Sequence, residues 1–315
     1  MNGIIGRLKN AYETDGIKEV FRKAFWKSVY IKNGIRIKKD LQEKQLEYGL
    51  CKPNTRQYQV IVSLTTFPKR FSYIEDCLKS LVVQNEKPDK IIVYLGSDSV
   101  GIELPAQMKL FEEYGVEFRY DEKEDLRSHK KYFYAMQEFP EAVVVTADDD
   151  IIYPSNWLTS LLQSYEKYPN CISARRVHLM LKGSEGHLRE YNHWIDQCRK
   201  EPGPSNALIA TGNAGILYPP HCLDERAFDV EKIKKYCFAA DDIWLKCMAL
   251  LKGTKYVWVP NNEVDLPEIK DCQSTGLNKL NVVQNMNDVY FAKMCQVYGI
   301  EVDAFFEKQG GKESV

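Results

Sequence analysis

Three consecutive aspartates, Asp148 to Asp150, directly follow a run of apolar β-formers at residues 142–147. A continuous apolar run without alternation is typical of a strand buried on both faces of a sheet. Neighbouring carboxylates repel one another, and burying them without a partner is costly. A divalent cation removes this cost, because Mg²⁺ and Mn²⁺ bind one or two carboxylates together with substrate phosphates. A solvated acidic turn is the simpler alternative, but the position after a buried strand favours a metal.

A second acidic pair, Asp241 and Asp242, stands at the start of a helical pattern. Alone, this pair is explained by the helix dipole, which favours carboxylates in the first turn. Together with Asp148 to Asp150, it indicates that one cluster holds the metal of a sugar nucleotide and the other supplies a base. A carboxylate that takes the proton of an acceptor hydroxyl on the far side of a sugar ring leads to inversion at the anomeric carbon. The metal meanwhile neutralises the leaving diphosphate.

The elements that position these clusters alternate between strands and helices. The predicted strands are Tyr58–Leu64, Lys90–Leu95, Val116–Tyr120 and Val143–Val145. Apolar residues at helical spacing lie between them, and a β-α-β-α-β-α-β series predicts a parallel sheet with helices on its faces. Ligands of such sheets bind outside the carboxyl ends of the strands. The three aspartates therefore stand where a metal–nucleotide would bind.

The chain beyond this strand contains a long irregular segment and a tight turn. Residues 182–206 are rich in Gly, Pro and polar residues, and loops of this length are usually functional or mobile. His193 and Trp194 in this segment could stack on an acceptor sugar, although Trp is also a common loop anchor. Gly212 and Gly215 mark a turn where a ligand could approach the backbone.

These motifs resemble, as a set, those of a bacterial GT-A glycosyltransferase. The set comprises the strand Val60–Thr66, the Asp148–Asp150 strand end, the Gly212/Gly215 turn and the segment Ala240–Leu245. The closest resemblance is to family-2-like enzymes encoded with capsule, lipopolysaccharide and other surface-glycan genes, over roughly residues 58–259. It implies an α/β, Rossmann-like GT-A fold with a mostly parallel sheet flanked by helices. It further implies inverting, metal-dependent transfer of a hexose from a UDP-linked sugar to a glycan or lipid-linked glycan acceptor in surface polysaccharide synthesis.

The resemblance also assigns residues. Asp148 and Asp150 are the implied ligands of Mn²⁺ or Mg²⁺, and Asp149 would lie near the ribose or the metal. Asp242 is the implied base, with Asp241 beside it, and the choice between the two stays open. The implied contacts of the donor nucleotide are Thr65, Thr66, Pro68, Arg70, Asp98, Lys130 and Asp149.

Charge is distributed unevenly along the chain. Residues 1–39 carry ten Lys/Arg and three Asp/Glu, although the net charge of the whole chain is −1. We expect residues 1–56 to form a basic amphipathic helical extension, residues 57–260 a catalytic domain divided at residue 150, and residues 261–315 a C-terminal helical segment. The basic segment either packs on the domain or lies on an anionic membrane surface, where each Lys or Arg is worth about 1 kcal/mol.

Composition is that of an ordinary soluble globule, with 44% hydrophobic residues. The near-zero net charge argues against nucleic acid as a partner. Nine scattered cysteines favour free thiols in a reducing cytoplasm. Neither a signal peptide nor a transmembrane stretch is recognisable. We therefore expect a cytoplasmic protein, either free or peripheral at the inner face of the plasma membrane.

Two other functions remain open on the sequence. A nucleotidyltransferase of sugar phosphates would share the sheet and the acidic residues, but it normally has a glycine-rich loop after the first strand, and residues 65–70 contain no Gly. A non-catalytic partner protein with the GT-A fold would be signalled by loss of acidic residues, and both clusters are intact. The donor sugar, the linkage, the acceptor and the oligomeric state are not set by the sequence.

Overall fold

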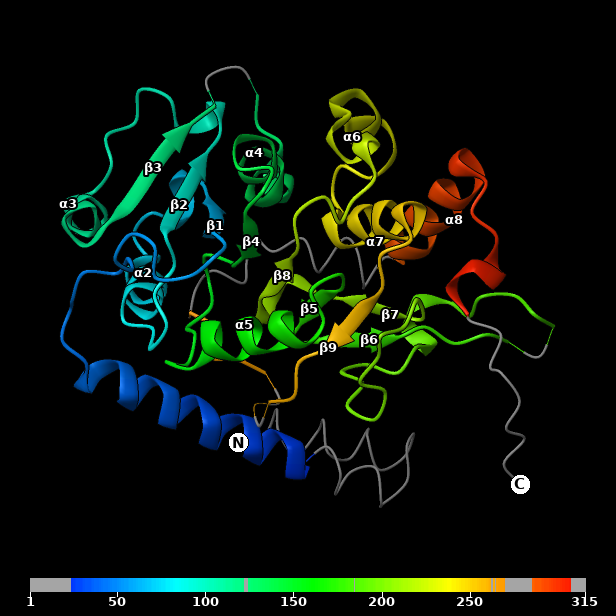
Figure 1. Ribbon diagram of the computed structural model, residues 1–315, viewed down its shortest axis with the longest axis horizontal. Coiled ribbons are helices and arrows are strands. Elements are labelled where there is room, and N and C mark those ends of the chain that lie inside the picture. Colours follow the sequence, from blue (N-terminus) through cyan, green and yellow to red (C-terminus); the bar gives the residue numbers. More distant parts are fainter. Residues whose placement is uncertain are drawn as a thin grey trace, which may run out of the picture.

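The computed structural model describes residues 24–121, 124–183, 185–261, 263, 265–269 and 285–306. Its centre is a seven-stranded sheet in the order β3-β2-β1-β4-β8-β5-β9, beside a two-stranded sheet of β6 and β7 (Figure 1). The strands are β1 (Val60–Thr66), β2 (Lys90–Leu95), β3 (Val116–Tyr120), β4 (Val143–Thr146), β5 (Ile172–Ala174), β6 (Val177–Leu179), β7 (Leu208–Ala210), β8 (Ile216–Tyr218) and β9 (Tyr256–Trp258).

The first four strands form the parallel half of the sheet. β1 pairs in parallel with β2 and with β4, and β2 pairs in parallel with β3. β8 runs antiparallel to β4 and β5, while β9 is parallel to β5. Val143 and Val145 of β4 are fully buried, as a strand with covered faces requires. The expected α/β fold with a mostly parallel sheet is confirmed.

Helices cover both faces of the sheet. Val60, Val62 and Leu64 of β1 share a buried cluster with α2 and α5, whereas Ile61 packs on the opposite face with Ala135 of α4. This alternation follows from the period of two along a strand. The helices are α2 (Glu75–Val82), α3 (Ala106–Lys109), α4 (Lys130–Glu138), α5 (Trp157–Lys167), α6 (Val230–Tyr236), α7 (Asp241–Lys252) and α8 (Met286–Tyr298).

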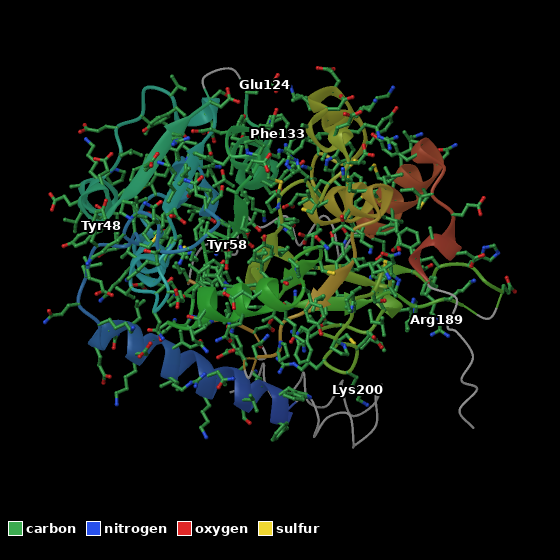
Figure 2. All side chains as sticks on the ribbon, in the orientation of Figure 1. Tyr48, Tyr58, Glu124, Phe133, Arg189 and Lys200 are labelled. Carbon is green, nitrogen blue, oxygen red and sulfur yellow. The ribbon has the colours of Figure 1, made fainter. Side chains whose placement is uncertain are left out.

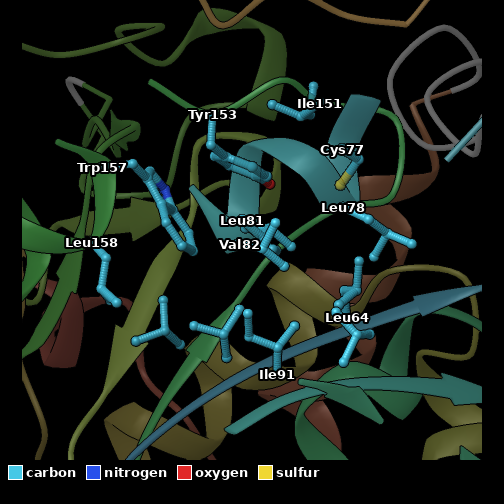
Figure 3. Close-up of a cluster of buried hydrophobic side chains, with 14 of the residues drawn as sticks. Leu64, Cys77, Leu78, Leu81, Val82, Ile91, Ile151, Tyr153, Trp157 and Leu158 are labelled. Carbon is cyan, nitrogen blue, oxygen red and sulfur yellow. The ribbon is translucent and has the colours of Figure 1, made fainter. Parts of the chain in front are cut away.

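The predicted glycine turn before β8 is held against a buried tryptophan (Figure 3 shows Trp157 in its cluster). The Nε1–H of Trp157 donates to the carbonyl oxygen of Ala214 at 2.9 Å. Gly215 has a φ of +92°, and a Cβ at this position would lie 2.3 Å from Trp157 Nε1. Only glycine fits here, because the buried side chain of Trp157 approaches the backbone at this position.

A helix at residues 24–43 precedes the sheet and lies along the lower edge of the view in Figure 1. Ile37 and Leu41 pack it into the cluster that contains α2 and α5. Phe25, Ile31 and Ile35 are exposed on this helix. Residues 1–23 of the predicted basic amphipathic extension lie outside the described residues. Among the described helices, none is long and apolar enough to cross a membrane.

The C-terminal helix α8 packs on α7, and residues of both helices belong to the buried cluster that contains β5, β8 and β9. The long segment between β6 and β7 runs out to the edge of the molecule, where Arg189 and Lys200 lie (Figure 2). The division at residues 56, 150 and 260 stays a prediction.

Candidate functional site

A cavity of about 970 Å³ opens at the carboxyl ends of β1 and β4, and it brings the two acidic clusters together. Among the predicted metal, base and donor residues, only Pro68, the first residue of a short 3₁₀ helix, does not line it. Of the two residues predicted to stack on an acceptor sugar, Trp194 lines the cavity and His193 does not. The predicted residues that line it are Thr65, Thr66, Arg70, Asp98, Lys130, Asp148, Asp149, Asp150, Asp241 and Asp242.

Lys131 joins the two clusters. This residue lies in the first turn of α4 and is 5% exposed. Its Nζ lies 2.9 Å from Oδ1 of Asp148 and 3.1 Å from Oδ2 of Asp241. Burial alone would lower the pKa of Lys131, but these carboxylates raise it well above its usual value, so the side chain is a buried cation. Burial raises and Lys131 lowers the pKa of Asp241, with a net lowering that keeps Asp241 ionised.

Asp149 is the inward-facing member of the three aspartates. It is 5% exposed and accepts a hydrogen bond of 2.6 Å from Oγ1 of Thr66 at the end of β1. The guanidinium of Arg70 donates to Asp149 and lies 3.2 Å from Oδ2 of Asp150. Burial raises the pKa of Asp149, although Arg70 opposes the shift. Asp149 therefore ties the ends of β1 and β4 together and orients Arg70 toward the cavity.

Asp148 and Asp150 offer a two-carboxylate site. Their side chains are 27% and 21% exposed and both line the cavity. Burial, followed by the charge of Asp148, raises the pKa of Asp150 to about 7. Within the described residues, no group of three or more His, Cys, Asp or Glu side chains could hold a metal ion. The pair fits Mg²⁺ or Mn²⁺ in its common arrangement, in which substrate phosphates and water complete the oxygen ligands.

Asp242 stands at the start of α7. Its Oδ2 accepts a hydrogen bond of 3.3 Å from the backbone N–H of Gly212 in the glycine turn. The helix begins after Ala240, and no side chain caps it through a hydrogen bond. Burial, followed by Asp241, raises the pKa of Asp242 to about 7. Among the described residues no cation forms an ion pair with Asp242, whereas Asp241 is held by Lys131.

The remaining predicted donor residues take different places. Thr65 donates its hydroxyl to the carbonyl oxygen of Tyr94 at 2.8 Å. Lys130 is 2% exposed and forms an ion pair with Asp125, which also lines the cavity. Asp98 lies in a 3₁₀ turn after β2, at the same rim. Lys130 and Lys131, which begin α4, are thus both buried and ion-paired.

A segment at residues 265–269, which we call the strap, contributes residues that sequence reasoning missed. The N–H of Ile269 donates to the carbonyl oxygen of Asp150 at 2.7 Å, and the N–H of Ile152 donates to Pro267 at 3.0 Å. The strap therefore pairs with the chain just after the three aspartates. Asp265 and Glu268 of the strap line the cavity. No local pattern could have indicated this pairing, because its two sides are far apart in the sequence.

Glu263, next to the strap, links it to the N-terminal helix. Its two carboxylate oxygens accept hydrogen bonds from Arg36 at 3.0 Å and from Arg175 at 2.8 Å. Glu263 is 7% exposed, so both ion pairs are shielded from solvent on at least one side. The helix at residues 24–43 is thereby tied to the same part of the chain that holds Asp150.

The chain matches one known protein family and is similar to solved structures. The model of the family described as glycosyl transferase family 2 matches residues 62–221, a segment that includes Asp148 to Asp150 and ends before Asp241. A mannosyltransferase from Pyrobaculum calidifontis, solved with GDP-mannose and Mn²⁺, is 13% identical over 89% of this chain and 74% of its own, with a TM-score of 0.49. A 4-diphosphocytidyl-2C-methyl-D-erythritol synthase is 13% identical over 70% of this chain and 97% of its own, with a TM-score of 0.43. No curated protein matches the chain in sequence.

Proposed function

The chain belongs to glycosyl transferase family 2, and we propose that it transfers a sugar from a nucleotide-sugar donor to an acceptor hydroxyl with inversion of the anomeric carbon. One observation carries this proposal: the strand-end carboxylates Asp148 and Asp150 and the carboxylate Asp242 line the same cavity. A donor site and a base must face the same reacting carbon, and these two clusters can do so because they share that space.

On the donor side, Asp148 and Asp150 would hold Mn²⁺ or Mg²⁺, which neutralises charge on the diphosphate when bound. Arg70 adds a positive charge beside Asp150. Thr65 and Asp98 lie at the rim that would hold the nucleoside. These residues bind and orient the donor and do not act on the acceptor.

On the acceptor side, Asp242 would take the proton of the attacking hydroxyl. Asp241 is occupied by Lys131, so Asp242 is the carboxylate with freedom to accept a proton. A base whose pKa lies near the working pH combines a useful ionised fraction with basicity. The pKa of Asp242, raised to about 7 by burial and by Asp241, meets this condition.

The finer substrate assignment rests on the motif resemblance. We infer a UDP-linked hexose as donor and a surface-glycan or lipid-linked glycan as acceptor. Incubating the purified protein with a panel of UDP-, GDP- and dTDP-sugars and Mn²⁺ tests this, with chelation by EDTA as the control. Turnover of UDP-hexoses that EDTA stops is the expected result. Turnover of sugar phosphates with nucleoside triphosphates would instead establish a nucleotidyltransferase.

The helix at residues 24–43 supports a peripheral site of action, which we propose is an anionic membrane surface at the cytoplasmic face. Its exposed side chains include Phe25 (59%), Ile31 (49%) and Ile35 (65%). Lys32 and Lys39 extend from the same helix, which carries five Lys/Arg and two Asp/Glu. Apolar side chains flanked by cations are typical of helices that bind anionic lipid.

A further inference from the structure

The cavity extends past Asp242 to a wall that no donor residue forms. We call this the acceptor-side wall. It is built from the long segment after β6, the glycine turn and the start of α8. Its members are Tyr191, Asn192, Trp194, Asn213 and Asn287, all of which line the cavity.

The aromatic part of the acceptor-side wall is held rigidly. The ring centroid of Tyr191 lies 4.8 Å from that of Trp194 and 5.7 Å from that of His178. Trp194 is 7% exposed, and its Nε1–H donates to the carbonyl oxygen of Arg189 at 2.7 Å. Phe291 of α8 supports it from behind, edge to face at 5.6 Å. Tyr191 is thereby fixed as the more accessible ring of the wall.

The amide part of the wall has unused hydrogen-bonding capacity. Asn287 is 6% exposed and lines the cavity. Oδ1 of Asn213 is buried and also has no hydrogen-bond partner in the described part of the chain. A buried polar group without a partner costs about 1–3 kcal/mol. The unpartnered oxygen of Asn213 and the amide of Asn287 line one cavity, which indicates a ligand that carries both donors and acceptors.

The charges around the wall argue against a phosphate as this ligand. Arg176 lies 3.3 Å from Asp196 and 3.4 Å from Asp265, so its charge is already balanced. Arg127 lies over the ring of Phe238 at 4.5 Å. Asp196 and Asp265 are themselves cavity residues and would repel an anion. An aromatic ring beside the amides of Asn213 and Asn287 suits a neutral sugar, whose C–H face packs on the ring while its hydroxyls bind the amides.

We propose that the acceptor-side wall is the acceptor subsite and that the end of the acceptor is a neutral saccharide. This inference rests on the proposed transferase function. The sugar packs on Tyr191 and bonds Asn213 and Asn287, which directs one hydroxyl to Asp242. That hydroxyl oxygen forms the new bond to the anomeric carbon of the donor. The bond from this carbon to the diphosphate breaks, and the hydroxyl proton passes to Asp242.

Saturation-transfer NMR tests the subsite with methyl glycosides of glucose, galactose, mannose, N-acetylglucosamine and rhamnose as probes. We expect at least one glycoside to bind the unsubstituted protein. Tyr191→Ala and Asn287→Ala should each lower the affinity for that glycoside about tenfold, whereas Tyr191→Phe should retain most of the affinity. His193→Ala is the matched control, because His193 is 66% exposed, near Glu190, and does not line the cavity.

Calorimetry with UDP and Mn²⁺ on the same variants separates this proposal from the transferase function. Wall variants that lose glycoside binding but keep UDP affinity support the subsite. Absence of saturation transfer from every glycoside, equal loss of glycoside and UDP binding, or displacement of the glycoside by inorganic phosphate would overturn it. If the protein binds glycosides through Tyr191 but binds neither UDP- nor GDP-sugars, the proposed saccharide subsite stands and the proposed transferase function is refuted.

Discussion

Replacing Asp242 with Asn keeps the shape of the side chain and removes its ability to accept a proton. Burial and Asp241 raise the pKa of Asp242 from 3.8 to about 7. A base must be ionised before it acts. We therefore expect kcat/KM for transfer by the unsubstituted protein to rise with pH until about 7 and to level off above this value.

The size of the effect follows from the titration. The ionised fraction falls about tenfold per pH unit below the pKa, so roughly 1% of the plateau rate should remain two units below it. Asp242→Asn should lower the plateau by about 10²–10⁴ and remove the acidic limb of the profile.

The same substitution should lower the rate of transfer but raise the stability of the folded protein at neutral and alkaline pH. The folded protein binds the proton of Asp242 more tightly than the unfolded chain does. The contribution of this residue to stability therefore decreases as the pH rises from 3.8 to about 7. Above this range Asp242→Asn should be more stable than the parent protein, by up to about 4 kcal/mol. Urea denaturation at acidic and at alkaline pH measures the difference.

The rate assay is best made at saturating Mn²⁺. Burial and Asp148 also raise the pKa of Asp150 to about 7, and a bound cation keeps that carboxylate ionised. Affinity for UDP and Mn²⁺ is the control, because the donor belongs to the other cluster. A flat profile below pH 7, or an Asp242→Asn variant of nearly full activity, would refute the assignment of the base. Donor affinity that falls in step with the rate would place Asp242 in the metal site.

Three further predictions concern other parts of the molecule. Asp150→Ala should abolish turnover and weaken Mn²⁺-dependent binding of UDP in calorimetry, and activity that persists in EDTA would contradict the metal site. Gly215→Ala should lower the free energy of unfolding by about 2 kcal/mol or more, because its φ is +92° and a Cβ would lie 2.3 Å from Trp157 Nε1. Urea denaturation measures this change. A variant as stable as the parent would show that Trp157 can move aside without lowering the free energy of unfolding. Replacing both Ile31 and Ile35 with Glu should reduce cosedimentation with anionic liposomes and leave UDP affinity unchanged, whereas equal sedimentation would argue against the lipid surface.

Local patterns in the sequence were sufficient for the parallel half of the sheet. The predicted strands Lys90–Leu95 and Val116–Tyr120 coincide with β2 and β3. Apolar runs bounded by turn residues depend on neighbours in the chain, so they can be recognised without the fold. The positions of Asp148 to Asp150 at a strand end and of Asp242 at a helix start follow from the same signals.

The orientation of these side chains was decided by tertiary contacts. Asp149, rather than either neighbour, is buried because Thr66 and Arg70 approach it from the adjacent strand end. Lys131 has the sequence context of a solvated helix start, yet it is buried because carboxylates from β4 and α7 meet it. Which of several adjacent charges is buried depends on the partners that the fold brings near.

The outer parts of the cavity also depend on the tertiary structure. The strap pairs with Asp150, and Asn287 reaches the cavity from α8, although neither segment has a motif of its own. Sequence alone determined the kinds of elements and the residues able to do chemistry, because propensity and hydrophobic period act over a few neighbouring residues. Only the tertiary structure decided which of those residues share one cavity, because that depends on packing between segments far apart in the chain.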